Sequence, residues 1–171
     1  KEVKFEVIPD QSPTAIALQT GEVNFATIES STIAQLSANP NIEIAEVANS
    51  GFTYVSMNTE KEPFNNVKVR QAINYAINRE NLVQGCYDGE AEVNSNICSK
   101  DRFGYSDDQF QYTYDPEKAK ELLKEAGYPD GFTTTLMYSN TTANQKKAEF
   151  YKQQLSEVGI DLELNGMENA V

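Results

Sequence analysis

Histidine is absent from this chain of 171 residues. Its absence excludes Ser-His and Cys-His nucleophile pairs and every metal site that depends on a histidine ligand. Carboxylates alone can perform acid–base chemistry, but none of the 26 Asp and Glu residues shows a recognisable catalytic spacing. The sequence therefore predicts neither a metal site nor a cofactor, and it disfavours an enzyme.

Basic residues are few and never cluster beyond pairs. Lys and Arg number 14, which gives a net charge of −12 and a pI near 4.4. Nucleic acid binding needs a concentrated basic face, so no nucleic acid partner is expected. No run approaches the roughly 18 apolar residues of a membrane span, and none is predicted. The first five residues contain no signal-peptide core, which we interpret as a chain cut from a longer protein rather than one that lost its leader.

Cysteine occurs twice, at Cys86 and Cys98. Neither belongs to a C-x-x-C pair, and two thiols without histidine cannot build a structural zinc site. A short-loop disulfide would suit an oxidising compartment. Two separate thiols fit the sequence equally well, so both alternatives stay open.

The pattern of apolar residues and breakers predicts an α/β fold. Apolar residues make up 39% of the chain, as in ordinary globular proteins. Alternation or β-rich composition predicts strands, and spacings of three and four predict helices. We expect strands at residues 3–8, 23–28, 42–47, 52–58, 132–138 and 160–164. We expect helices at residues 12–20, 30–36, 66–77, 78–83, 115–126 and 141–158.

Helix caps are the clearest local signals. Five helix starts are predicted from proline at the first helical position or from a polar capping residue. They lie at Pro13, Ser30 or Ser31, Asn65 or Asn66, Asp115, and Thr141 or Thr142. Helices that end in glycine and lead at once into a β run recur, which favours a mixed β-sheet flanked by helices. Residues 85–114 have little periodicity and are predicted to form a long surface excursion.

Four segments keep the order and spacing of one family. They are residues 17–25 (ALQTGEVNF), 57–80 (MNTEKEPFNNVKVRQAINYAINRE), 114–128 (YDPEKAKELLKEAGY) and 131–160, which starts with Gly-Phe and ends in Leu-Ser-Glu-Val-Gly-Ile. Together they resemble the extracellular solute-binding proteins of family 5, which serve dipeptide, oligopeptide and nickel ABC importers. The chain departs from the family pattern at Asn24, where aspartate is usual.

The resemblance implies a lobe of the periplasmic-binding-protein type II kind. Residues 1–50 would form the end of the first lobe and a hinge-proximal segment. Residues 51–171 would form the second lobe, truncated at its C-terminal side. The implied function is the capture of oligopeptides or dipeptides by closure of two lobes, and their delivery to ABC permease subunits. The implied location is the periplasm, or the outer face of the cytoplasmic membrane through a lipid anchor.

The resemblance also suggests ligand-contacting residues. Tyr54, Ser56 and Asn58 would share one face of the strand that enters the second lobe, and Tyr138 and Asn140 would follow the Thr-rich strand near the cleft. Simple packing in the sheet is an equally good interpretation of the first three. The alternatives are a receptor for nickel or another solute, a surface adhesin or scaffold without transport, and, less favoured, a carboxylate-dependent hydrolase.

Overall fold

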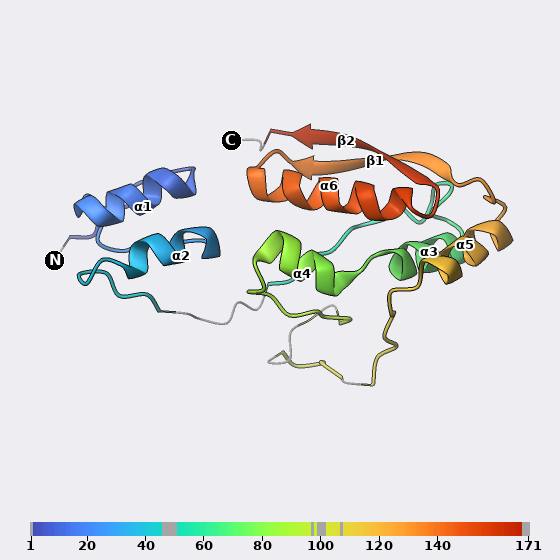
Figure 1. The fold of residues 1–171 in the computed structure, drawn as a ribbon, viewed down its shortest axis with the longest axis horizontal. Helices are drawn as coiled ribbons and strands as arrows, with labels where there is room; N and C mark the ends of the chain where they lie inside the picture. Colours follow the sequence, from blue (N-terminus) through green and yellow to red (C-terminus); the bar gives the residue numbers. More distant parts are fainter. Residues whose placement is uncertain (1, 46–50, 97, 99–101, 107, 169–171) are drawn as a thin grey trace. The chain divides into compact units, whose positions relative to one another are not determined.

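The chain forms two compact units in the computed structural model. One comprises Lys1–Asn49 and the other Ser50–Val171 (Figure 1). The structure describes residues 2–45, 51–96, 98, 102–106 and 108–168. The assignment of these units to two lobes of a receptor stays a prediction.

The first unit contains two helices, α1 (Gln11–Thr20) and α2 (Ser30–Ser37). Helix α1 ends as predicted at Gly21, whose left-handed φ of 77° a residue without Cβ adopts freely. Both predicted starts are wrong. Helix α1 begins two residues before Pro13, and α2 has Glu29 at its N-cap position without a side-chain cap. A buried Leu36 forms part of this unit's apolar interior.

The second unit contains helices α3 (Val67–Ala76), α4 (Arg79–Tyr87), α5 (Pro116–Glu125) and α6 (Thr142–Ser156). A polar side chain caps each start and accepts a hydrogen bond from a backbone N–H of the first turn. This confirms the caps predicted for α3, α5 and α6, while the cap of α4 was not predicted. The cap residues are Asn66, Asn78, Asp115 and Thr141.

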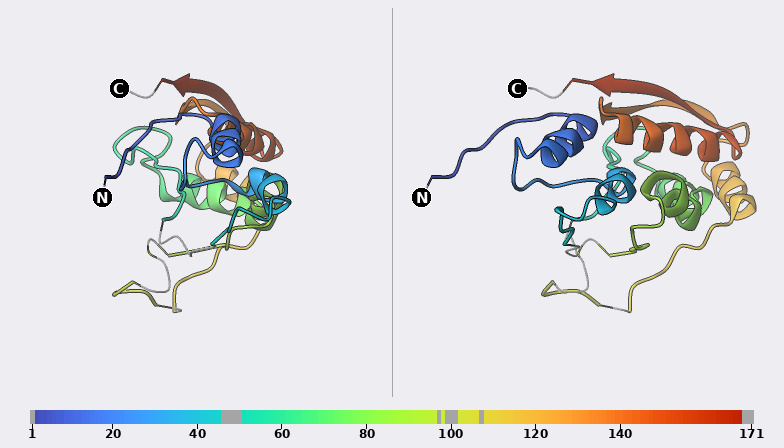
Figure 2. Two further views of the ribbon diagram at one scale, coloured as in Figure 1. Left: turned by 90° about the vertical axis from the view of Figure 1, so that its left-hand side faces the viewer. Right: turned by 60° about the vertical axis from the view of Figure 1, so that its left-hand side comes forward.

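Strands β1 (Phe132–Ser139) and β2 (Ile160–Met167) form a parallel pair. Helix α6 connects them and runs alongside the pair in every view (Figures 1 and 2). The register begins with Phe132 opposite Ile160. Just before it, a Cβ on Gly131 would lie 1.8 Å from the carbonyl oxygen of Gly159, so this approach is possible only for glycine.

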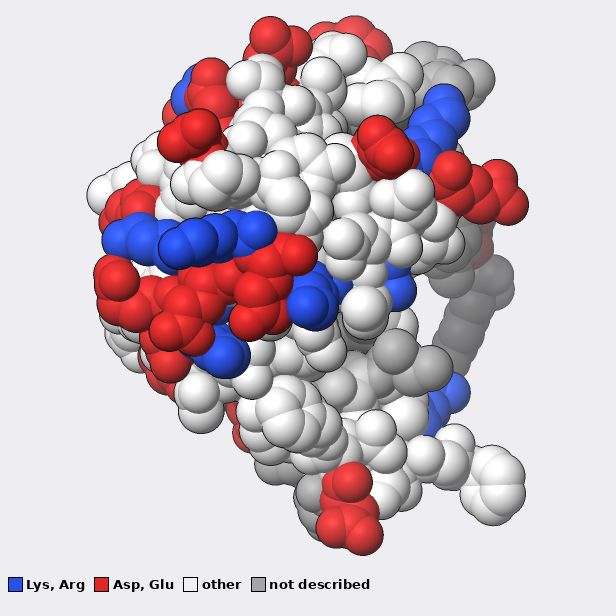
Figure 3. All heavy atoms as spheres, turned by 90° about the vertical axis from the view of Figure 1, so that its right-hand side faces the viewer, with Lys and Arg blue, Asp and Glu red and all other residues white. Residues whose placement is uncertain are grey.

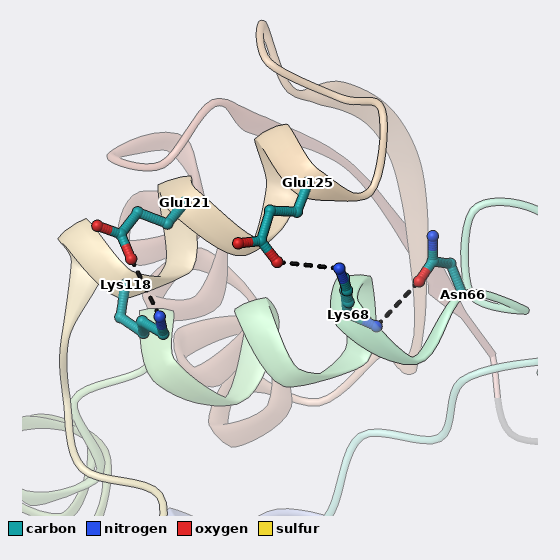
Figure 4. A network of polar contacts seen from close by, with 5 residues as sticks. All are labelled: Asn66, Lys68, Lys118, Glu121 and Glu125. Atoms are coloured by element: carbon teal, nitrogen blue, oxygen red, sulfur yellow. Dashed lines mark hydrogen bonds and ion pairs between the residues drawn. The ribbon is translucent and has the colours of Figure 1, made fainter.

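The core of the second unit lies between the strands and the helices. It contains Val69, Ala72, Ala76 and Ile77 from the α3 region, Ala119, Leu122 and Leu123 from α5, Leu155 and Val158 from the α6 region, and Ile160 and Leu162 from β2. Helix α3 packs against α5, and Lys68 bridges them with a 3.0 Å ion pair to Glu125 (Figure 4). Because both side chains are largely exposed, packing rather than this pair holds the helices together.

The α/β class is confirmed, but much of the expected sheet is not formed. We expected a mixed sheet, but the described residues contain one two-stranded sheet whose strands are parallel. Three predicted strands have no strand structure: residues 3–8, 23–28 and 52–58. The predicted strand 42–47 is also absent at residues 42–45, and its residues 46 and 47 lie outside the described residues. A β-rich sequence becomes a strand only when a neighbour accepts its backbone hydrogen bonds.

The segment 85–114 begins inside a helix, because α4 extends to Tyr87. Asp88 then ends α4 with a left-handed φ of 52°. The described residues from 88 to 114 have neither helix nor strand, as expected for an excursion. In the part of the chain that the structure describes, no helix is long and apolar enough to cross a bilayer.

Candidate functional site

The carboxyl ends of β1 and β2 form a polar edge that gathers two of the predicted site residues. Because the strands are parallel, both end at the same side of the sheet, the side on which ligands bind in open α/β proteins. Tyr138 lies opposite Gly166 in the register and is partly buried. Asn140 follows β1, is exposed, and donates its backbone N–H to the Met167 carbonyl oxygen at 2.8 Å.

Tyr138 and Asn140 converge over Gly166. A Cβ at Gly166 would lie 3.2 Å from Asn140 Oδ1 and 3.3 Å from Tyr138 Oη. The two polar tips therefore lie close enough that a side chain at position 166 would make tight contacts with both. The edge presents a phenol hydroxyl and an amide within reach of one small ligand group.

Two further side chains complete this edge, and neither was predicted. Glu168 Oε1 accepts a 3.0 Å hydrogen bond from Asn140 Nδ2. Asn144 in the first turn of α6 donates its Nδ2 to the Ser139 carbonyl oxygen at 3.1 Å. The predicted strand 160–164 stops too early to place position 168 beside position 140. A predicted strand that continued through Gly166 would have placed Glu168 beside Asn140.

Tyr54, Ser56 and Asn58 lie on a segment without regular structure. All three are exposed, as are their neighbours Phe52 and Val55, so the expected alternation of faces is absent. The Tyr54 ring contacts Phe52 with centroids 5.5 Å apart. Asn58 Oδ1 accepts the backbone N–H of Glu60 at 3.0 Å, a local turn.

In the described part of the chain, no hydrogen bond joins these three residues to Tyr138 or Asn140. The structure therefore brings Tyr138 and Asn140 together over Gly166, and no hydrogen bond among the described residues adds Tyr54, Ser56 or Asn58 to this pair.

A second polar cluster surrounds Arg79 and has a structural role. Arg79 Nη1 donates to the carbonyl oxygens of Asn74 at 3.2 Å and Tyr112 at 3.3 Å, and Nη2 donates to Asn74 Oδ1 at 2.8 Å. Burial lowers the pKa of Arg79. Burial also raises the pKa of the nearby Tyr151 phenol to about 12. This guanidinium ties α3, α4 and the chain before α5 together.

Cys86 and Cys98 are both free thiols, so the disulfide left open by the sequence is not formed in this structure. Cys86 belongs to α4 and lines an open groove of about 560 Å³ between α4 and α6. Burial raises the pKa of its thiol, which keeps it protonated. Within the described residues, no group of three or more His, Cys, Asp or Glu could hold a metal ion.

Charged side chains interleave on the face that carries α5, where Figure 3 shows Lys and Arg among Asp and Glu. Lys118 pairs with Glu121 at 3.0 Å and Lys120 pairs with Glu117 at 2.8 Å. These bonds raise the pKa of both lysines. The face is thus a neutralised, solvated surface rather than a basic patch for an anionic partner.

Known proteins similar to this chain are solute receptors. The glutathione-binding protein GsiB of Salmonella choleraesuis is 40% identical over 168 residues, which are 97% of this chain and 33% of the relative. The chain thus spans about a third of the length of the curated relatives it matches.

Two solved structures have the same fold. The periplasmic binding protein DppA of Helicobacter pylori, in complex with the peptide STSA, has a TM-score of 0.87 and 39% identity, covering 94% of this chain and 31% of that one. A dipeptide-binding protein from Pseudoalteromonas sp. SM9913, in complex with Met-Leu, has a TM-score of 0.84 and 27% identity, covering 95% and 33%. The type II periplasmic-binding-protein fold is thereby confirmed. The family profile of bacterial extracellular solute-binding proteins, family 5 Middle, matches residues 1–171, and the chain belongs to this family.

Proposed function

We propose that the chain is part of an extracytoplasmic receptor that captures peptides for an ABC importer. Membership of family 5 along all 171 residues is the observation that carries this proposal. The glutathione-binding and peptide-binding relatives support a short peptide as the ligand class. The receptor binds its ligand without converting it, hands it to permease subunits, and works in the periplasm or from a lipid anchor.

The carboxyl edge of β1 and β2 is the part of this chain that we propose to contact the ligand. Its Tyr138 hydroxyl and Asn140 amide can exchange hydrogen bonds with the backbone of an extended peptide. Backbone recognition of this kind leaves the peptide side chains free to vary. Tyr54, Ser56 and Asn58 remain proposed contacts, and their exposure leaves them accessible to a ligand.

Calorimetric titration of the full-length receptor tests this function. The probes are glutathione, Ser-Thr-Ser-Ala and Met-Leu. Glucose and Ni²⁺ serve as controls, because they represent a sugar and a metal ion rather than a peptide. We expect saturable binding of at least one of the three peptides and none of the controls. Binding of Ni²⁺ or glucose with no peptide binding would refute the proposed ligand class. Hydrolysis of a bound peptide during the titration would refute the role as a receptor.

A further inference from the structure

Two hydrogen bonds fix Asn140, one at its backbone and one at its side chain. The backbone N–H donates to the Met167 carbonyl oxygen at 2.8 Å, and Nδ2 donates to Glu168 Oε1 at 3.0 Å. Both acceptors belong to the end of β2 and the residue that follows it. The amide group is therefore held with its donor toward Glu168 and its oxygen on the side of Gly166.

A carboxylate fixes the amide in one of its two flipped states. An ionised carboxylate only accepts hydrogen bonds, so it faces the NH₂ group of Asn140 and repels the oxygen. A flipped amide would lose the 3.0 Å bond and would place two oxygens against each other. The Glu168 carboxylate thus holds the Asn140 amide with its Oδ1 acceptor directed away from Glu168.

Gly166 serves the same arrangement by leaving space. Its backbone is outside the left-handed region, so an alanine there would not strain the main chain. An added Cβ would, however, lie 3.2 Å from Asn140 Oδ1 and 3.3 Å from the Tyr138 ring and hydroxyl, closer than most such contacts. Both polar tips would have to move.

We infer that Glu168 and Gly166 are positioning residues, which hold the Asn140 amide so that its oxygen, rather than its NH₂ group, meets the ligand. This inference rests on the proposed function. It specifies the ligand chemistry at this edge as an N–H donor, such as a backbone amide of an extended peptide. Glu168 acts through Asn140 and does not itself contact the ligand.

The test is a double-mutant cycle in the full-length receptor, titrated with glutathione, Ser-Thr-Ser-Ala and Met-Leu. Glu168→Ala should weaken binding of the recognised peptide by about three- to ten-fold, the worth of one oriented hydrogen bond. Glu168→Gln offers Nδ2 an acceptor but can also donate to a flipped Asn140, so it should restore only part of the affinity that Glu168→Ala loses. The control Glu163→Ala removes an exposed acid from β2, the strand that Glu168 follows, and should leave affinity unchanged.

The double-mutant cycle and the NMR signals of Asn140 test whether Glu168 acts by orienting the Asn140 amide or by a general effect on the charge or stability of the receptor. In an Asn140→Ala background, Glu168→Ala should have no further effect on affinity. The side-chain NH₂ resonances of Asn140 should shift in ligand-free Glu168→Ala and return toward their original positions in Glu168→Gln. Gly166→Ala should lower affinity with an unchanged thermal midpoint.

Several results would overturn the inference. Equal losses for Glu168→Ala and Glu163→Ala would point to net charge, and additive losses with Asn140→Ala would show that Glu168 acts independently. A receptor that binds a peptide equally well with and without Glu168 would overturn the inference alone. An unaltered receptor that binds no probe peptide would overturn the proposed function, and the inference with it.

Discussion

Replacement of Gly131 by alanine should destabilise the second unit more than any ordinary glycine substitution. The new Cβ would lie 1.8 Å from the Gly159 carbonyl oxygen and 2.4 Å from its carbon. An ordinary C···O contact is about 3.3–3.6 Å, so the two backbones must separate by about 1.5 Å. This separation breaks the 3.2 Å bond from the Phe132 N–H to the Gly159 oxygen and opens the first strand pair, where Ile160 is fully buried.

The magnitude follows from three contributions. The left-handed φ of 77° costs an alanine about 1–2 kcal/mol. The lost hydrogen bond adds about 1 kcal/mol, and the disturbed packing of Ile160 about as much again. We therefore expect the free energy of unfolding to fall by about 3–4 kcal/mol, near the upper end for single substitutions.

Gly127 provides the matched control. It also has a left-handed φ, of 92°, but no heavy atom lies within 4 Å of an added Cβ. Gly127→Ala should cost only the backbone strain, about 1–2 kcal/mol. Urea unfolding followed by far-ultraviolet circular dichroism measures both variants. Equal losses for the two would refute the reasoning, since they would mean that the approach of Gly159 contributes nothing.

Three further predictions concern other residues. The pKa of Tyr151 is raised from 10.0 to about 12, so between these pH values the folded state keeps a proton that the unfolded state loses. Tyr151 should therefore lower the free energy of unfolding by at most about 3 kcal/mol as pH rises from 10 to 12, and Tyr151→Phe should reduce the fall measured by pH-dependent urea unfolding. Arg79→Lys keeps the charge but loses the fork that spans Asn74 and Tyr112, so thermal unfolding should show a loss of about 1–3 kcal/mol; an unchanged midpoint would contradict this tie. Asp115→Ala removes the cap of α5 and should cost about 1 kcal/mol in urea, whereas Asp115→Asn should cost less than half of that.

Helix starts in the second unit were predictable because capping is local. Asp115 followed by Pro116 places an acceptor and a preset φ within two positions, and no distant residue is needed. The same holds for Asn66 and Thr141. In the first unit, Asp10 and Glu29 occupy the N-cap positions without side-chain caps, so the local signal was misleading there.

Strands were predicted less well because they depend on partners. Residues 52–58 are as β-rich as β1, but β1 has β2 to pair with and 52–58 has no strand partner among the described residues. Pairing also lengthens β2 beyond the predicted end at 164, since β1 supplies hydrogen bonds as far as Met167. Gly166 and Glu168 were not singled out for this reason, while the end of the Thr-rich strand pointed to Tyr138 and Asn140, whose contact with a ligand stays a prediction.

The core of the second unit leaves one long stretch of sequence free to change. In chain order, the core cluster passes from Ile77 directly to Ala119. None of the described residues between these two belongs to the cluster. The near end of this stretch is secured where Gln154 Oε1 accepts the Asn78 N–H at 3.0 Å, and its far end where Arg79 holds the Tyr112 carbonyl oxygen. Substitutions and length changes in the part of this stretch that follows α4 and precedes Tyr112 should cost little stability. We therefore expect this stretch to diverge fastest as receptors of the family evolve toward new solutes, on a scaffold that stays the same.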